Sequence, residues 1–189
     1  LVADEVICGF GRTGNVWGSQ TMNIKPDILT CAKALSASFL PISAVMVNEK
    51  VYQALMSESD KIGTWGHGFT YSGHPVAAAV ALEAQKIYDE TDLFGHAKRM
   101  SPIFSKHVQS FADHPLVGEA MSIGMMGALE IVADKKTKAP FDLGAPGAAG
   151  LRVYNHAVAR GLFIRNMGDR VAICPPLVIN ETELGDLFG

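Results

Sequence analysis

An acid and a lysine stand where two apolar segments of the 189-residue chain end. Asp4 and Glu5 follow the apolar run that opens the chain, and Lys33 follows the apolar run 28–32. Ligands of open α/β sheets bind at the carboxyl ends of the strands. A buried acid and a buried lysine are costly there unless they pair or serve a ligand. We therefore expect Asp4 and Lys33 to belong to one site.

Pyridoxal phosphate chemistry requires two such groups. A lysine amine of lowered pKa forms a Schiff base with the aldehyde and later moves a proton, and a carboxylate keeps the pyridine nitrogen protonated. Each group also has a structural interpretation, because an Asp-Glu pair often caps a turn and a lysine after an apolar run often extends its amine to water. Taken singly, the two groups leave both interpretations open.

The sequence around these residues resembles the signature of class III, fold-type I pyridoxal-phosphate aminotransferases. The resemblance rests on the order and spacing of residues 1–14, 25–29 and 32–36. It implies that Asp4 is the partner of the pyridinium nitrogen, that Val6 is an apolar wall against the ring, and that Lys33 is the Schiff-base lysine. The implied cofactor is pyridoxal 5'-phosphate.

Three residues after the lysine depart from the family pattern. Ala34, Ala37 and Ser38 stand where the family often has glycines. We expect this departure to affect the geometry of the loop and to leave the chemistry unchanged.

Gly9, Gly11 and Gly14 form a GxGxxG string, which favours an alternative, a nicotinamide oxidoreductase. A dinucleotide fingerprint must lead into a helix whose N-terminus holds the pyrophosphate, whereas residues 15–19 show no helical pattern. The resemblance implies instead that these glycines form a loop beside the site.

The glycine-rich segment 65–77 ends at the start of a predicted helix. Hydroxyl donors beside a helix N-terminus suit an anion, although the same pattern describes a loop that caps a core helix. By resemblance to the family, Thr70 reaches the cofactor phosphate of the neighbouring subunit and Phe69 lines that subunit's pocket, which implies a homodimer. His67 and His74 lack further ligands, so we expect no metal site.

Residues 161–176 contain two predicted strands joined by a tight turn at 167–169. An arginine beside such a turn is commonly solvated. The segment resembles the C-terminal hairpin of amine:pyruvate and ω-amino acid transaminases, in which a mobile arginine binds the substrate carboxylate. That role falls to Arg165, with Arg170 as second choice, since the planar guanidinium matches a carboxylate.

Apolar runs alternate with helical patterns up to about residue 90, which predicts an α/β unit. A more polar pattern follows, so we expect a domain boundary at 93/94. Residues 1–93 are predicted to be the C-terminal part of a cofactor-binding large domain with a mostly parallel sheet and flanking helices, and 94–189 most of a small α+β domain. The predicted strands are 1–4, 28–32, 42–47, 127–132, 162–165 and 171–174; the predicted helices are 49–56, 75–82 (apolar nearly all round and buried), 100–111, 150–160 and one from 181.

The composition is that of a globular protein without a basic excess. Charged residues make up 19% of the chain, apolar residues 48%, and the formal net charge is −3. Nothing indicates nucleic acid or an anionic membrane as a partner, and no segment is apolar enough to span a bilayer. Three distant cysteines indicate reduced, buried thiols in a cytoplasmic protein.

Together these features predict a transaminase that moves an amino group from an amine or ω-amino acid to a keto acid such as pyruvate, by ping-pong chemistry. Other class III enzymes share Asp4 and Lys33, among them 4-aminobutyrate and acetylornithine transaminases, aminomutases and decarboxylases. Both ends of the chain look cut. We therefore also expect a piece of a larger enzyme that is inactive if it lacks the upstream half of the site.

Overall fold

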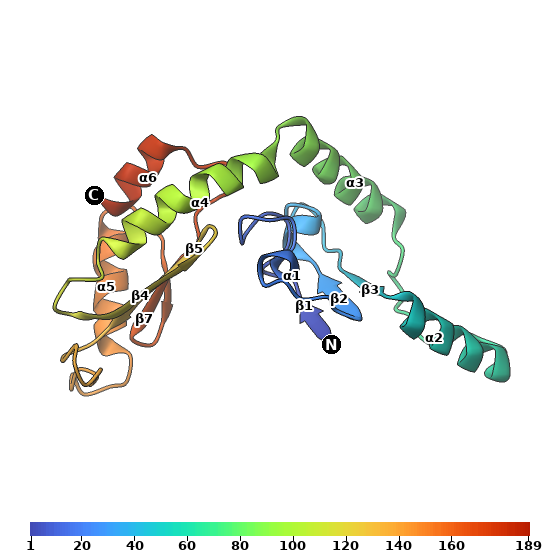
Figure 1. Cartoon of the computed structure of the whole chain (residues 1–189), viewed down its shortest axis with the longest axis horizontal. Coiled ribbons are helices and arrows are strands. Elements are labelled where there is room, and N and C mark those ends of the chain that lie inside the picture. The colour runs from blue at the N-terminus through green and yellow to red at the C-terminus, as the bar shows by residue number, and fades with distance from the viewer. The chain divides into compact units, whose positions relative to one another are not determined.

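The structure is a computed structural model that describes residues 1–189, and it divides into two compact units. Unit 1 covers Leu1–Phe94 and unit 2 covers Gly95–Gly189. Each has a sheet of its own, and Figure 1 labels most of the elements of both. No helix in either unit combines the length and the apolarity needed to cross a bilayer.

The sheet of unit 1 has three strands in the order β1-β2-β3. β1 (Val2–Asp4) pairs in parallel with β2 (Ile28–Cys31), and β2 pairs antiparallel with β3 (Ala44–Val47). Two short helical segments lie between the strands, α1 (Gly18–Thr21) after β1 and the 3-10 helix η1 (Lys33–Leu35) after β2. The sheet within this chain is therefore mixed, with one parallel pair.

Two longer helices complete unit 1, α2 (Glu49–Ile62) and α3 (Pro75–Glu90). The side chain of Asn48 caps α2 by accepting a hydrogen bond from Val51 N at 3.0 Å. The helix ends where Gly63 takes a left-handed conformation with φ 72°, which glycine adopts without steric cost. Both helices extend about two turns beyond the predicted ends. The prediction stopped short because the second halves of the helices are polar and lack the apolar run of the first halves.

Much of the apolar surface of unit 1 is exposed, contrary to the prediction of buried strands and a buried α3. Val45 is 66% exposed on the edge strand β3 and Val2 is 62% exposed on β1. In α3 only Ala77, Ala81 and Ala84 are buried, and Leu82 is 73% exposed. The small residues form one packed stripe, whereas the apolar residues on the other sides have no cover within this chain.

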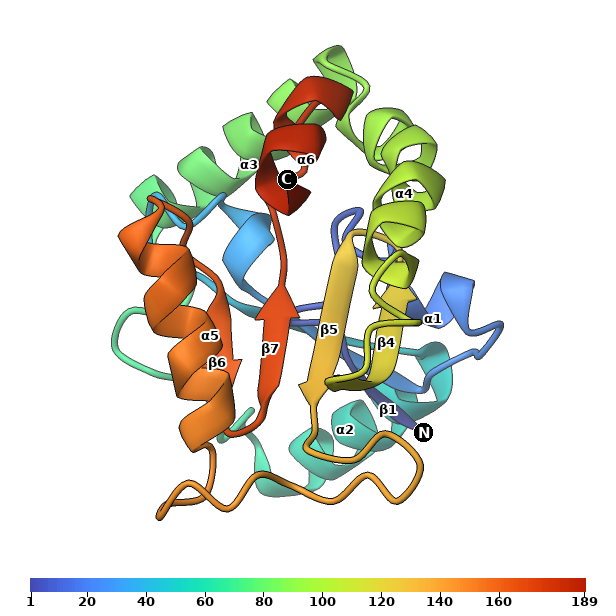
Figure 2. The ribbon, with the colours of Figure 1, turned by 90° about the vertical axis from the view of Figure 1, so that its left-hand side faces the viewer.

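Unit 2 is an antiparallel sheet with helices, in the strand order β4-β5-β7-β6. Figure 2 shows β5 and β7 at its centre. The helices are α4 (Leu93–Gln109, whose first two residues belong to unit 1), α5 (Ala148–Ala159) and α6 (Glu181–Phe188); the strands are β4 (Val117–Ile123), β5 (Met126–Ile131), β6 (Arg165–Met167) and β7 (Arg170–Ile173).

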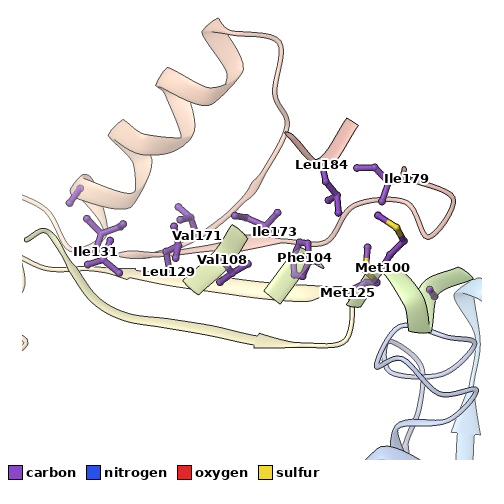
Figure 3. Close-up of a cluster of buried hydrophobic side chains, with 13 residues drawn as sticks. Met100, Phe104, Val108, Met125, Leu129, Ile131, Val171, Ile173, Ile179 and Leu184 are labelled. Carbon is purple, nitrogen blue, oxygen red and sulfur yellow. The ribbon is translucent and has the colours of Figure 1, made fainter. Parts of the chain in front are cut away.

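The core of unit 2 lies between α4 and the sheet (Figure 3). Phe104 and Val108 of α4 are fully buried, as is Leu184 of α6. Gly127 of β5 permits this packing, because a Cβ there would stand 2.7 Å from Val108 Cγ2 and 3.0 Å from the ring of Phe104. A side chain at Gly127 would force α4 away from the sheet.

Two predictions for unit 2 differ from the structure. Strand β4 was missed, because the small residues Gly118, Ala120 and Ser122 occupy every second position and the strand lacks a β-branched run. The strand predicted at 162–165 begins only at Arg165, and Phe163 before it is 79% exposed. The tight turn between β6 and β7 is confirmed at Gly168 and Asp169.

Candidate active site

Parallel pairing places the ends of β1 and β2 at one edge of the sheet of unit 1. Asp4, the last residue of β1, lies opposite Thr30 of β2. Thr30 Oγ1 donates to Asp4 Oδ1 at 3.4 Å, and Val6 N donates to the same oxygen at 3.0 Å. The two hydrogen bonds orient the carboxylate, and Oδ2 of Asp4 has no hydrogen-bond partner in the chain. Val6 therefore contacts Asp4 through its backbone amide, and its side chain is half-buried.

Lys33 follows β2 at the same edge and has an unusual backbone. It begins η1 with φ 47°, in the left-handed region that non-glycine residues rarely adopt. Such residues cluster where the surrounding structure imposes a conformation for function. The side chain of Lys33 is exposed and forms no hydrogen bond or ion pair in the chain. The expectation that Asp4 and Lys33 are buried is wrong here, since both are exposed at the open edge.

Glu5, beside Asp4, is the buried acid of this region, with 2% of its surface exposed. Its carboxylate accepts hydrogen bonds from Gly18 N at 2.7 Å and Ser19 N at 2.6 Å, the first amides of α1. These amides are the donors that a dinucleotide fingerprint offers to a pyrophosphate. Because Glu5 already occupies them, and α1 is only four residues long, the GxGxxG string has no site for a dinucleotide.

Helix α3 holds the loop that carries Lys33, a role that sequence reasoning missed. Tyr88 donates its hydroxyl hydrogen to Ala34 O at 2.9 Å, and Gln85 Nε2 donates to Leu35 O at 3.0 Å. Burial raises the pKa of the Tyr88 hydroxyl, so it remains a donor at neutral pH. The sequence signal was weak, because two polar residues three apart describe any solvated helix face.

Thr70 and Phe69 lie in an exposed turn that precedes α3. Phe69 N donates to Ser72 Oγ at 2.9 Å, and the Phe69 side chain is 78% exposed. No hydrogen bond joins this turn to Asp4 or Lys33 within the chain. A hollow of about 460 Å³ lies beside it, lined by Pro41–Ser43 and by Phe69, Tyr71–His74 and Ala77.

Metal ligands and reactive thiols are not gathered in this region. His74 caps α3 through Nδ1, which accepts from Val76 N at 3.3 Å. No three His, Cys, Asp or Glu side chains in residues 1–189 are grouped so as to hold a metal ion. Burial raises the pKa of the Cys31 thiol and, together with Glu5, that of Cys8. Cys174 is exposed, so the prediction of buried thiols does not hold for it.

The two candidate arginines of unit 2 differ in their surroundings. Arg165 begins β6, is exposed, and has no ion-pair partner in the chain. Arg170 begins β7 and lies opposite Glu130 of β5, to which its Nη2 donates at 2.9 Å. Arg165 is therefore the freer of the two guanidinium groups.

The hairpin that carries Arg165 is fixed at its turn by α5. Gly150 N, in the first turn of α5, donates to Asp169 Oδ1 at 3.0 Å. A Cβ at Gly150 would stand 2.0 Å from Gly168 O, and one at Gly147 would stand 2.9 Å from Gly168 Cα. Glycines thus permit direct contact between the start of α5 and the β6–β7 turn.

A parallel strand pair with a carboxylate and a lysine at its carboxyl edge is the arrangement of an α/β enzyme that binds its ligand at that edge. The family described as Aminotransferase class-III matches residues 1–189. The chain belongs to this family of class III aminotransferases, and its fold is that of part of a fold-type I transaminase.

Relatives and solved structures agree with this assignment. Gamma aminobutyrate transaminase 1 of Solanum lycopersicum, named as mitochondrial, is 44% identical over 100% of this chain and 36% of its own length. A structure titled "Transaminase with L-ala" is 49% identical with a TM-score of 0.96, covering 100% of this chain and 44% of the other. The ω-transaminase of Pseudomonas jessenii in complex with PMP is 49% identical, with a TM-score of 0.93 over 97% of this chain and 40% of the other. The chain thus spans between a third and a half of the length of these proteins.

Proposed function

We propose that the full-length protein carrying this sequence is a pyridoxal-phosphate-dependent transaminase, with an amine or ω-amino acid as donor and a keto acid such as pyruvate as acceptor. The observation that carries the proposal is the pairing of Asp4 with Thr30 on parallel strands, which brings Asp4 and the left-handed Lys33 to one edge of the sheet. A Pseudomonas relative with this fold was solved with PMP, the amine form of the cofactor.

The chain's own groups fit this cofactor. Asp4 keeps Oδ2 free while Oδ1 is held by two hydrogen bonds, so an anionic oxygen is available to a protonated ring nitrogen. Lys33 has an unpaired amine, as a nucleophile that must react and later carry a proton requires. When bound, pyridoxal phosphate supplies the aldehyde and an electron-withdrawing ring. Val6 is the proposed apolar wall against that ring.

Two further roles belong to the proposal. Thr70, with Phe69 beside it, serves the phosphate and pocket of a second subunit, so the active protein is a homodimer; the exposure of this turn within one chain supports that role. Arg165 binds the substrate carboxylate, supported by its exposed and unpaired guanidinium. We assign residues 1–93 to the cofactor-binding domain and 94–189 to the small domain, and the protein to the cytoplasm.

Borohydride trapping tests the proposed cofactor lysine. The full-length protein is loaded with pyridoxal phosphate, reduced with borohydride and analysed by peptide mass spectrometry. We expect the cofactor mass on the peptide that contains Lys33, and no visible absorbance band and no activity in Lys33→Ala. Lys25→Ala, which removes another exposed lysine, serves as the control and keeps both. Full activity of Lys33→Ala would refute the proposal.

A second experiment tests the substrate class. Donors are screened with pyruvate and with 2-oxoglutarate as acceptors, because the tomato relative is named for 4-aminobutyrate. We expect pyruvate to be preferred, and Arg165→Ala to raise the KM for pyruvate roughly 10- to 100-fold, the value of a charged hydrogen bond. Arg170→Ala leaves that KM unchanged. Preference for 2-oxoglutarate with 4-aminobutyrate as donor would instead indicate a 4-aminobutyrate transaminase.

A further inference from the structure

The loop that follows Lys33 is strained at three positions. Lys33 has φ 47°, Ala37 has φ 50° and Ser38 has φ 63°, all in the left-handed region. Side chains with a Cβ adopt this region at a cost, and the conformation persists only where neighbouring groups fix it. Something must therefore hold the loop, and with it the direction in which the Lys33 side chain leaves the backbone.

Backbone hydrogen bonds inside the loop supply part of this constraint. Lys33 O accepts from Ser36 N at 3.2 Å and from Ser38 N at 3.1 Å, and Ser36 Oγ donates to Leu40 O at 2.7 Å. These contacts close the loop on itself. They do not tie it to the rest of unit 1.

Helix α3 supplies the tie. Gln85 and Tyr88 lie three residues apart and so on one face of the helix. Their side chains reach the carbonyl oxygens of Leu35 and Ala34, at 3.0 and 2.9 Å respectively. Both side chains are half-buried, which strengthens hydrogen bonds relative to those in open water. The two acceptors belong to the two residues directly after Lys33. The bonds therefore hold the peptide groups that join Ala34 to Leu35 and Leu35 to Ser36, at the end of the 3-10 helix that Lys33 begins.

We propose that Gln85 and Tyr88 are positioning residues for Lys33, holding its strained backbone so that the amine meets the aldehyde of pyridoxal phosphate. This inference rests on the proposed function. It assigns to α3 a part in catalysis although neither side chain needs to touch the cofactor. Loss of either bond lets the loop relax toward an ordinary backbone conformation and turns the amine away from the aldehyde.

The test uses conservative variants of the full-length protein. Tyr88→Phe removes only the hydroxyl, and Gln85→Met keeps the length of the side chain without its donor. Tyr52→Phe, an exposed tyrosine of α2, is the matched control. For each, we measure the thermal unfolding midpoint, the fraction of bound pyridoxal phosphate attached to Lys33 by visible absorbance and borohydride trapping, and kcat and KM for the donor.

We expect Tyr88→Phe and Gln85→Met to lower the attached fraction and to lower kcat by about tenfold, with KM unchanged within about twofold, the pattern of lost transition-state stabilisation. Tyr52→Phe changes neither. If the two variants unfold earlier but keep the attached fraction and kcat of the wild type, α3 only stabilises the fold and the inference is wrong. If one of the two variants does not fold, the other variant tests the inference by the same measurements.

The wild-type protein separates this inference from the function on which it rests. A wild type without trappable pyridoxal phosphate at Lys33 refutes the proposed function itself. A wild type with the trapped cofactor, combined with unaffected variants, refutes only the role of Gln85 and Tyr88.

Discussion

The buried carboxylate of Glu5 accepts a hydrogen bond from Ser19 N at 2.6 Å, across fourteen residues of chain. The same carboxylate accepts from Gly18 N, so one acid from the end of β1 satisfies the first amides of α1. Glu5 is thereby fixed next to Asp4. The two neighbouring acids thus have different roles. Glu5 is buried and structural, whereas Asp4 is exposed and available to a ligand.

Glu5→Gln tests the structural half of this division. The amide keeps one acceptor oxygen but turns an NH2 group toward a backbone N–H, which leaves a buried donor unsatisfied. We expect the free energy of unfolding to fall by about 2–3 kcal/mol, as for lost hydrogen bonds to a charged group. Chemical denaturation measures the change. Glu58→Gln, on the exposed face of α2, changes stability by much less; equal effects of the two variants would contradict the assigned role.

The residues after Lys33 that depart from the expected family pattern include two with an unusual backbone conformation. Ala37 and Ser38, two of the residues that we expected to replace glycines of the family pattern, both adopt left-handed backbone with φ 50° and 63°. Ala34, the third departure, is not left-handed. The loop therefore keeps a glycine-type conformation without the glycines.

Replacing these residues by glycine relieves the strain. We expect Ala37→Gly to raise the free energy of unfolding by about 1 kcal/mol, because left-handed backbone costs an alanine roughly 1–2 kcal/mol and the added flexibility of glycine offsets part of the gain. Ala34→Gly, at a position with no such strain, lowers stability instead. Thermal unfolding of both variants measures the difference, and a destabilised Ala37→Gly would show that the loop is not held as described.

The sequence was most informative where residue types are tied to chemistry. Asp4 and Lys33 stood out because an acid and a lysine follow apolar runs, and the resemblance to the family signature then favoured the chemical interpretation over the structural one. The structure brings both residues to one sheet edge. The β6–β7 turn could be predicted because glycine and aspartate mark tight turns. Strand β4 could not, since every second residue is a glycine, alanine or serine and Glu119 interrupts the apolar residues between them, which weakens the hydrophobic signal.

Burial was the property least accessible to prediction. Apolar runs predicted buried strands, but β1 and β3 expose much of their apolar surface within this chain. The contacts of Gln85 and Tyr88 were also beyond prediction, because they join positions about fifty residues apart through backbone acceptors. Such contacts depend on the packing of α3 against η1, which no local pattern specifies.

Two helical glycines provide a matched test of the contact between α5 and the hairpin of Arg165. At Gly150 an added Cβ would stand 2.0 Å from Gly168 O, whereas at Gly185 of α6 it would meet nothing within 4 Å. We expect Gly150→Ala to destabilise unit 2 by about 3 kcal/mol or more through backbone displacement. Gly185→Ala stabilises it by up to about 1 kcal/mol, the helix propensity difference. Calorimetry distinguishes the two; a tolerated Gly150→Ala would contradict the close approach.

The last prediction concerns pH and rests on a charge network across three strands of unit 2. Glu119, Glu130 and Arg170 lie opposite one another in neighbouring strands. Lys138 Nζ lies 2.7 Å from Glu119 Oε2 and 3.2 Å from Glu130 Oε2. The hydrogen bond from Arg170, followed by the Lys138 ammonium beside Oε2, lowers the pKa of Glu130 below its usual value. Lys138 also separates two carboxylates that would otherwise repel each other.

A lowered pKa in the folded state gives the sign of the effect. Glu130 stabilises the fold at pH values above the pKa of an unfolded glutamate, and this contribution disappears as the pH falls through its lower folded value. We expect Glu130→Gln to cost about 1 kcal/mol at pH 7, and the gap from wild type to close below about pH 4. Unfolding midpoints from pH 7 to pH 3 measure it, with Glu58→Gln, at an exposed acid of α2, as the control of small effect. A gap that widens in acid would mean that the network does not hold Glu130 in its charged form.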